Sequence, residues 1–183
     1  MRIGIFGGAF DPPHMGHITV AAYALATARL DILWVIPCWK HAFDKKMSLF
    51  EDRDRMCREA FPPVFGDRVK VLPIEAILKT QYTVDLIEEL HRQNPNDQLV
   101  MIIGWDEFQN LDKWHRIDDL RKLVEFFPVS RGMSRHEMDF VVPDVNSTFI
   151  RKILTGFAPK VFKQWIPTGV IAYIEKYGLY KNN

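Results

Sequence analysis

The stretch that decides the fold reads IGIFGGAFDPPHMGH and covers residues 3–17. Its apolar start predicts a buried strand that breaks at Gly7 and Gly8, and a turn stiffened by two prolines then leads into a helix. Glycine lets a backbone approach a ligand closely, and a helix N-terminus offers unpaired N–H groups with a partial positive charge. His14 and His17 add further donors at that N-terminus. The stretch therefore predicts a cradle for an anionic group such as phosphate.

Length, charge and cysteine content limit the class of protein. With 183 residues the chain suits one compact domain, which we expect to span residues 1–183. Its formal net charge of +1 gives no reason to expect nucleic acid or a membrane surface as a partner. Cys38 and Cys57 lack the spacing of a metal site, and no apolar run approaches the roughly 20 residues that span a bilayer. The first residues do not resemble a signal peptide, so we expect a reduced, cytoplasmic protein.

Strand-like and helix-like segments alternate along the chain, which predicts an α/β protein with a doubly wound parallel sheet. The expected strands are residues 2–6, 32–36, 69–72, 99–103 and 123–129, and the expected helices are residues 16–29, 48–60, 83–93, 117–122, 146–154 and 168–177. Ser48 with Glu51 is typical of a capping box, and Thr83 is an expected N-cap. Either Asn146 or Ser147 is expected to cap the helix at 146–154.

In such sheets, ligands bind at the carboxyl ends of the strands. The glycine–histidine turn follows the first expected strand, the polar loop 37–47 follows the second, and Gly104-Trp105-Asp106 follows the fourth. The turn matches neither GxGxxG nor GxxxxGK(S/T), which disfavours a dehydrogenase or a P-loop enzyme. Two histidines and Asp11 are a thin set of metal ligands without a further partner, so no metal site is expected. The plainer alternative to an anion-binding role is that His14 and His17 are a pair of surface histidines at a helix start.

Two motifs carry a resemblance to a known superfamily. GGAFDPPHMGH, residues 7–17, resembles the HxGH signature of the nucleotidylyltransferases, and NSTFIR, residues 146–151, resembles their SSTxIR signature. Similarity to the bacterial nicotinate mononucleotide adenylyltransferases extends to QYTVD at 81–85, IIGWD at 102–106, Trp114 and the segment 166–180. It covers nearly the whole chain and is weakest between residues 132 and 144. The resemblance implies a Rossmann-like fold of the nucleotidylyltransferase type. It also implies transfer of AMP from ATP to nicotinate mononucleotide, giving nicotinate adenine dinucleotide and pyrophosphate in NAD biosynthesis.

The resemblance also implies roles for individual residues. The catalytic residues would be His14, His17, Lys45 and Arg151. ATP would be bound by Gly7, Gly8, Ala9, Phe10, His14, Gly16, His17, Gly104, Asp106, Ser147, Thr148 and Arg151. Lys46 is an open alternative to Lys45, because Phe43-Asp44 stands where the superfamily has a proline pair. On spacing alone, residues 146–151 would also suit a capped helix with a surface arginine. Lys45 and Lys46 would also suit a loop with solvated lysines.

The resemblance places a pyridine mononucleotide against Tyr82, Thr83, Trp114 and Arg131. An indole face suits a flat, cationic ring, so Trp114 would cover the pyridine, although core packing is its plainer role. Two departures from the family pattern leave the acceptor open: Gln81 replaces a serine, and Trp105 replaces a smaller residue. Arg131 lacks the proline expected after it, so a solvated surface arginine is its alternative role. Nicotinamide mononucleotide or another phosphorylated small molecule is the alternative acceptor. A non-catalytic nucleotide-binding sensor is the alternative function.

The expected reaction needs little covalent chemistry from the protein. A phosphate monoester is largely ionised at neutral pH, since its second pKa is about 6, and it needs no general base to act as a nucleophile. Catalysis would then rest on positioning and charge stabilisation. Mg²⁺ would be carried by the ATP phosphates, because the sequence offers no protein cage for it. ATP and a pyridine mononucleotide are the expected partners, and a homo-oligomer is left open.

Overall fold

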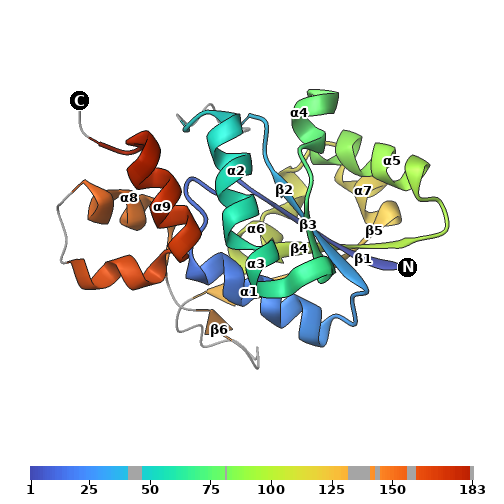
Figure 1. The fold of residues 1–183 in the computed structure, drawn as a ribbon. Helices are drawn as coiled ribbons and strands as arrows, with labels where there is room; N and C mark the ends of the chain where they lie inside the picture. Colours follow the sequence, from blue (N-terminus) through green and yellow to red (C-terminus); the bar gives the residue numbers. More distant parts are fainter. Residues whose placement is uncertain (41–46, 81, 132–140, 143–144, 156–159, 182–183) are drawn as a thin grey trace.

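The computed structural model describes residues 1–40, 47–80, 82–131, 141–142, 145–155 and 160–181 (Figure 1). Within them lies a sheet of six parallel strands in the order β3-β2-β1-β4-β5-β6. The strands are β1 (Arg2–Gly8), β2 (Ile32–Pro37), β3 (Val69–Val71), β4 (Gln98–Gly104), β5 (Val124–Arg131) and β6 (Val141–Val142). This is the order of a Rossmann sheet, in which the direction of winding reverses between β1 and β4. The predicted doubly wound α/β fold is confirmed.

Helices cover both faces of this sheet. The described helices are α1 (Met15–Thr27), α2 (Phe50–Ala60), α3 (Pro62–Phe65), α4 (Ile74–Leu78), α5 (Thr83–Gln93), α6 (Trp105–Phe108), α7 (Ile117–Leu123), α8 (Ser147–Leu154) and α9 (Thr168–Tyr177). Short 3₁₀ helices are η1 (Gly66–Arg68), η2 (Leu111–Lys113) and η3 (Lys160–Trp165). In Figure 1, α1, α2, α8 and α9 lie towards one side of the sheet, and α5 and α7 towards the other. None of the described helices has the length and apolar character needed to cross a membrane.

Two hydrophobic cores follow from the alternation of side chains along the strands. Ile3 and Ile5 of β1 belong to the core under α5 and α7, whereas Phe6 belongs to the core under α1, α2 and α9. The neighbouring strands keep the same alternation, because Ile3 pairs with Ile32 of β2 and with Leu99 of β4. Both faces of the central strands are therefore buried, which explains their nearly continuous apolar sequences.

The start of α2 differs from the prediction. The helix begins at Phe50 after an N-cap residue, Leu49, that forms no side-chain cap. The predicted capping box of Ser48 and Glu51 is therefore wrong. The backbone of Ser48 makes a tertiary contact instead, since its N–H donates to the Asp11 carboxylate at 3.4 Å. Packing against the β1–α1 turn overrides the local capping signal here.

Two later helices begin close to their predicted first residues. The helix α5 covers the predicted range 83–93, but its N-cap is Tyr82, so the prediction of Thr83 as the N-cap is wrong by one residue. The helix α8 is capped by Asn146, one of the two predicted alternatives, whose side-chain oxygen accepts the Phe149 N–H at 2.9 Å. This leaves the Ser147 hydroxyl available for a contact outside its own helix.

Candidate active site

The turn between β1 and α1 packs tightly onto the core. Asp11 and His14 are only 4% and 2% exposed. The Phe10 ring is also buried and packs edge-on against Phe6, with ring centroids 5.3 Å apart. A Cβ atom at Gly8 would lie 3.1 Å from the Phe10 ring, which explains why glycine stands there. Because the Phe10 side chain is enclosed, only the backbone of this residue can face a ligand.

The two histidines of the turn stack on each other, with ring centroids 3.7 Å apart. The His14 backbone N–H donates to His17 Nδ1 at 3.2 Å. Because Nδ1 acts as the acceptor, a neutral His17 carries its proton on Nε2, which is then a donor for an anion. His14 is almost fully buried whereas His17 is half-buried. His17 is therefore the more accessible donor of the pair.

The turn and the first residues of α8 meet in space. Ser147 Oγ donates to the Pro12 carbonyl at 3.0 Å. Arg151 Nη1 donates to the Asp11 carbonyl at 2.6 Å, and its Nη2 donates to Thr148 Oγ1 at 3.2 Å. The two bonds to the turn span 135 and 140 residues of sequence. The two motifs that stand out in the sequence thus lie against each other.

The Asp11 carboxylate joins this pair of motifs to further segments. Its Oδ1 accepts the Tyr180 hydroxyl at 2.7 Å, and its Oδ2 accepts the Ser48 N–H at 3.4 Å. The same Oδ2 lies 3.6 Å from Arg151 Nη1. Burial, with the nearby Asp11 charge as the second cause, raises the pKa of Tyr180, so its hydroxyl stays a donor at neutral pH. Tyr180 ends the segment 166–180 that carries part of the family resemblance, but the sequence did not predict its contact with Asp11, which lies 169 residues away.

A buried arginine fixes the base of the loop that follows β2. Arg53 is 1% exposed, and its guanidinium donates to the Ala9 carbonyl at 2.9 Å and the Ser48 carbonyl at 3.1 Å. It also lies 3.8 Å from Cys38 Sγ. Burial raises the pKa of the Cys38 thiol, and the Arg53 charge opposes this shift. The sequence does hold a signal for Arg53, since helical spacing places it on the same buried stripe of α2 as residues 56, 57 and 60.

The end of β4 lies beside the turn, because β4 and β1 are neighbouring strands. Gly104 is the last residue of β4 and the N-cap of α6. Asp106 stands exposed in the first turn of α6. The Trp105 ring stacks on Phe108, with centroids 5.6 Å apart. The predicted segment Gly104-Trp105-Asp106 thus occupies the carboxyl edge of the sheet.

Aromatic side chains gather where α5 begins. The Tyr82 ring is 41% exposed and lies 4.2 Å from the His115 ring, at an angle of 30°. Trp114 is half-buried and packs against the core under α5 and α7, so part of its side chain serves in core packing. Thr83 is the first residue of α5. His115 is a neighbour of Tyr82 that its sequence spacing did not reveal.

Some predicted residues lie outside the described part of the chain. Lys45 and Lys46 fall in residues 41–46, and Gln81 is a single undescribed position. Arg131 ends β5, but its side chain is not among those described. The roles expected of these residues therefore stay predictions.

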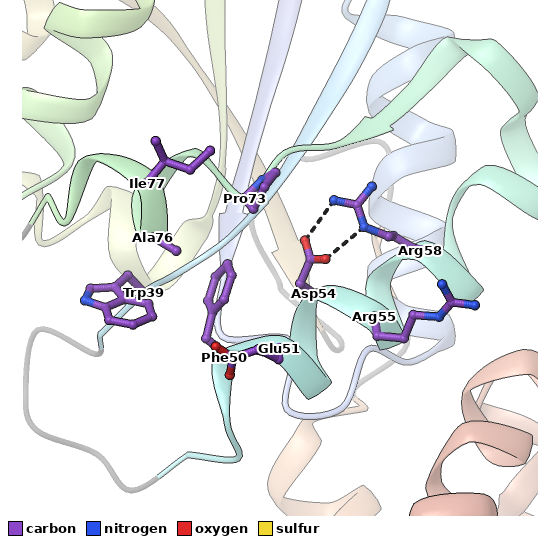
Figure 2. A pocket seen from close by; sticks show the side chains of 9 residues that line it. All are labelled: Trp39, Phe50, Glu51, Asp54, Arg55, Arg58, Pro73, Ala76 and Ile77. Atoms are coloured by element: carbon purple, nitrogen blue, oxygen red, sulfur yellow. Dashed lines mark hydrogen bonds and ion pairs between the residues drawn. The ribbon is translucent and has the colours of Figure 1, made fainter.

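A separate cavity of about 550 Å³ opens between α2 and α4 (Figure 2). Its walls are Trp39, Phe50, Glu51, Asp54, Arg55, Arg58, Pro73, Ala76 and Ile77, none of which is a predicted site residue. The Trp39 backbone N–H donates to Glu75 Oε2 at 2.9 Å, and burial raises the pKa of Glu75 to about 7. This contact anchors the first part of the loop that follows β2, just before the undescribed residues 41–46.

Comparison with known proteins gives the context for this arrangement. The sequence model of the cytidylyltransferase-like family matches residues 5–153. A "Probable nicotinate-nucleotide adenylyltransferase" of Shouchella clausii is 34% identical over 100% of this chain and 98% of its own. The nicotinate-nucleotide adenylyltransferase of Bacillus subtilis is 34% identical over 99% of both chains.

A solved structure has the same fold. The nicotinic acid mononucleotide adenylyltransferase of Plasmodium falciparum, complexed with NaAD, superposes with a TM-score of 0.81 at 22% identity. The superposition covers 98% of this chain and 97% of that one. Fold, motif geometry and full-length relatives agree, and the chain belongs to the cytidylyltransferase-like family.

Proposed function

We propose that this protein transfers AMP from ATP to nicotinate mononucleotide and releases pyrophosphate, a step in NAD biosynthesis. The observation that carries the proposal is the contact between the two motifs, in which Arg151 and Ser147 bind the carbonyls of Asp11 and Pro12. The names of the full-length relatives support the same reaction. We propose that one nucleotidylyltransferase domain spans residues 1–183.

The chemistry follows from the charges of the reactants. A phosphate oxygen of the mononucleotide attacks the α-phosphorus of ATP, a new P–O–P linkage forms, and pyrophosphate leaves with the electron pair of the broken P–O bond. His17 Nε2–H, the Arg151 guanidinium and the N-termini of α1 and α8 stabilise the charge on the phosphoryl oxygens. Holding the two reactants in line could supply roughly 7–11 kcal/mol of the rate enhancement.

The ATP site is proposed along the carboxyl edge of β1 and β4. Backbone N–H groups of the turn and helix starts contact the nucleotide, together with the side chains of His17, Thr148 and Arg151, while the buried His14 ring supports His17 from behind. The full proposed set is Gly7, Gly8, Ala9, Phe10, His14, Gly16, His17, Gly104, Asp106, Ser147, Thr148 and Arg151. Lys45 adds a positive charge from the loop after β2, with Lys46 as the alternative.

The mononucleotide is proposed to lie against Tyr82, Thr83, Trp114 and Arg131. The exposed part of the Tyr82 ring supports this location, since an aromatic face is offered at the same edge of the sheet. Trp114 packs partly on the core and is partly accessible, so its accessible part can cover a ligand ring.

Mg²⁺ is proposed to enter with ATP, bound by the phosphates. Among the described residues there is no cluster of three or more His, Cys, Asp or Glu side chains that could hold a metal ion. The buried carboxylate of the β1–α1 turn, Asp11, already accepts hydrogen bonds from Tyr180 and Ser48. The ion would neutralise charge on the triphosphate, and the residues named above would bind the phosphates around it.

The direct test measures pyrophosphate release with ATP and either nicotinate or nicotinamide mononucleotide. We expect turnover with the nicotinate form, with kcat/KM at least about tenfold higher than with the nicotinamide form. Faster turnover of nicotinamide mononucleotide would make that compound the acceptor instead. It would also indicate that Gln81 and Trp105, which differ from the family pattern, determine the choice of acceptor. Tight ATP binding without turnover of either compound would instead support a sensor domain.

Gly16→Ala is expected to raise KM for ATP about tenfold. A Cβ atom at Gly16 would lie 3.0 Å from His14 Nδ1 and 3.1 Å from His14 Cε1, so the histidine ring must shift. Steady-state kinetics at varied ATP measures this effect. The matched control is Gly169→Ala, whose Cβ would lie 3.0 Å from the Glu59 carbonyl, far along the chain from the turn. Equal KM values for ATP in the two variants would contradict the expectation.

A further inference from the structure

The Asp11 carboxylate has a donor at each oxygen. Tyr180 donates its hydroxyl to Oδ1 at 2.7 Å, and Ser48 donates its N–H to Oδ2 at 3.4 Å. Arg151 Nη1 stays 3.6 Å from Oδ2 but makes a 2.6 Å bond to the Asp11 carbonyl. The short contact of the guanidinium is thus with a neutral oxygen, and the ion pair beside it is long.

This geometry matters because a carboxylate and a guanidinium prefer to close a two-bond pair. In such a pair with Asp11, the guanidinium of Arg151 would commit two N–H groups and have its charge neutralised at short range. The hydroxyl of Tyr180 takes one acceptor position of Oδ1 and orients the carboxylate, and Arg151 approaches only Oδ2. Asp11 as a whole is also only 4% exposed, so water cannot readily replace the tyrosine as the donor to Oδ1.

We propose that Tyr180 is a positioning residue: its hydroxyl holds the Asp11 carboxylate in the orientation that leaves Arg151 available to a triphosphate. The inference rests on the proposed function, because it takes Arg151 as a phosphate ligand. It assigns a role to the segment after α9, which contributes a side chain to the turn between β1 and α1. Removal of the hydroxyl frees Oδ1, and Arg151 is drawn into a closer pair with Asp11.

The test compares Tyr180→Phe with Tyr173→Phe. Tyr173 is a matched control because its hydroxyl also donates to a distant carboxylate, Asp52 Oδ1, at 2.9 Å. We expect Tyr180→Phe to weaken ATP binding, measured by calorimetry without acceptor, about five- to tenfold and to raise KM for ATP by a similar factor. KM for the mononucleotide should stay within about twofold. Tyr173→Phe should change neither ATP value by more than about twofold.

A second readout separates positioning from general loss of structure. For each variant, the unfolding midpoint is measured without nucleotide and with saturating ATP. The difference between the two midpoints reports ATP binding, because a general folding defect lowers both midpoints. Tyr180→Phe should show a smaller rise than Tyr173→Phe. Equal rises, or equal dissociation constants, overturn the inference. A wild-type protein that binds ATP but transfers no AMP would defeat the proposed function while this comparison still stands.

A double-mutant cycle tests the path through Arg151. In an Arg151→Ala background, Tyr180→Phe should have no further effect on ATP binding, because the residue through which it acts is gone. The same five- to tenfold loss in that background would show that Tyr180 acts by another route and would overturn the inference.

Discussion

His17→Ala is expected to lower kcat for AMP transfer about 100- to 1000-fold. Its Nε2–H is the accessible donor of the β1–α1 turn, because Nδ1 is occupied by the His14 backbone N–H. Loss of one donor to a charge that develops in the transition state costs about 2.7–4 kcal/mol in comparable sites. Single-turnover pyrophosphate release at saturating ATP and mononucleotide measures the effect. His91→Ala, at a half-buried position in the last turn of α5, is the control and should retain nearly full activity.

Two amide variants of His17 can separate its two nitrogen atoms. Asparagine places a carbonyl oxygen near the position of Nδ1, so His17→Asn should keep the acceptor for the His14 N–H but lose the donor. Glutamine places an amide N–H group near the position of Nε2, so His17→Gln should retain more of kcat than His17→Asn. An alanine variant within about threefold of wild type would remove His17 from the mechanism. A better rescue by asparagine would show that the capping role of Nδ1 matters more than the donor.

The sequence predicted the parts of the site whose signals are local. Glycines, prolines and histidines within residues 3–17 predict the turn, and the apolar runs predict strands with two buried faces, as the cores around Ile3 and Phe6 confirm. The cap at Asn146 also depends on a residue three positions away. Such features follow from backbone chemistry that acts over one turn of chain.

The parts that escaped prediction depend on distant partners. Ser48 has the sequence of a capping residue, but its backbone N–H is drawn to Asp11, 37 residues away. Tyr180 and Asp11 are 169 residues apart, and no periodicity connects them. Phe10 stands within the predicted anion cradle, yet its ring is part of the core. Tertiary packing decided each of these cases, and local propensity did not.

Arg53→Met is expected to destabilise the protein by about 2–4 kcal/mol. Methionine fills the space of the side chain but leaves the carbonyl groups of Ala9 and Ser48 without their donor. A buried polar group that loses its partner costs about 1–3 kcal/mol, and relief from burying the guanidinium charge offsets part of that cost. At about 2–4 °C per kcal/mol for a chain of this size, the unfolding midpoint should fall by roughly 5–15 °C.

The control for this variant lies on the same helix. Arg55→Met removes an arginine whose side chain is 58% exposed and whose ion pair with Glu59 is a surface i,i+4 pair, so its midpoint should change by no more than about 2 °C. Equal midpoints for the two variants would contradict the buried role of Arg53.

Arg53→Met should also lower AMP transfer at temperatures where the variant is folded. The guanidinium bonds the Ser48 carbonyl after the undescribed residues 41–46 and contacts Cys38 Sγ before them. It thereby holds together both ends of the segment that carries Lys45, and its bond to the Ala9 carbonyl ties these ends to the glycine turn. If Lys45 acts on the triphosphate, loss of this clamp should raise KM for ATP more than KM for the mononucleotide. A variant with lower stability but unchanged KM for ATP would restrict Arg53 to a structural role and would argue against Lys45 as a phosphate ligand.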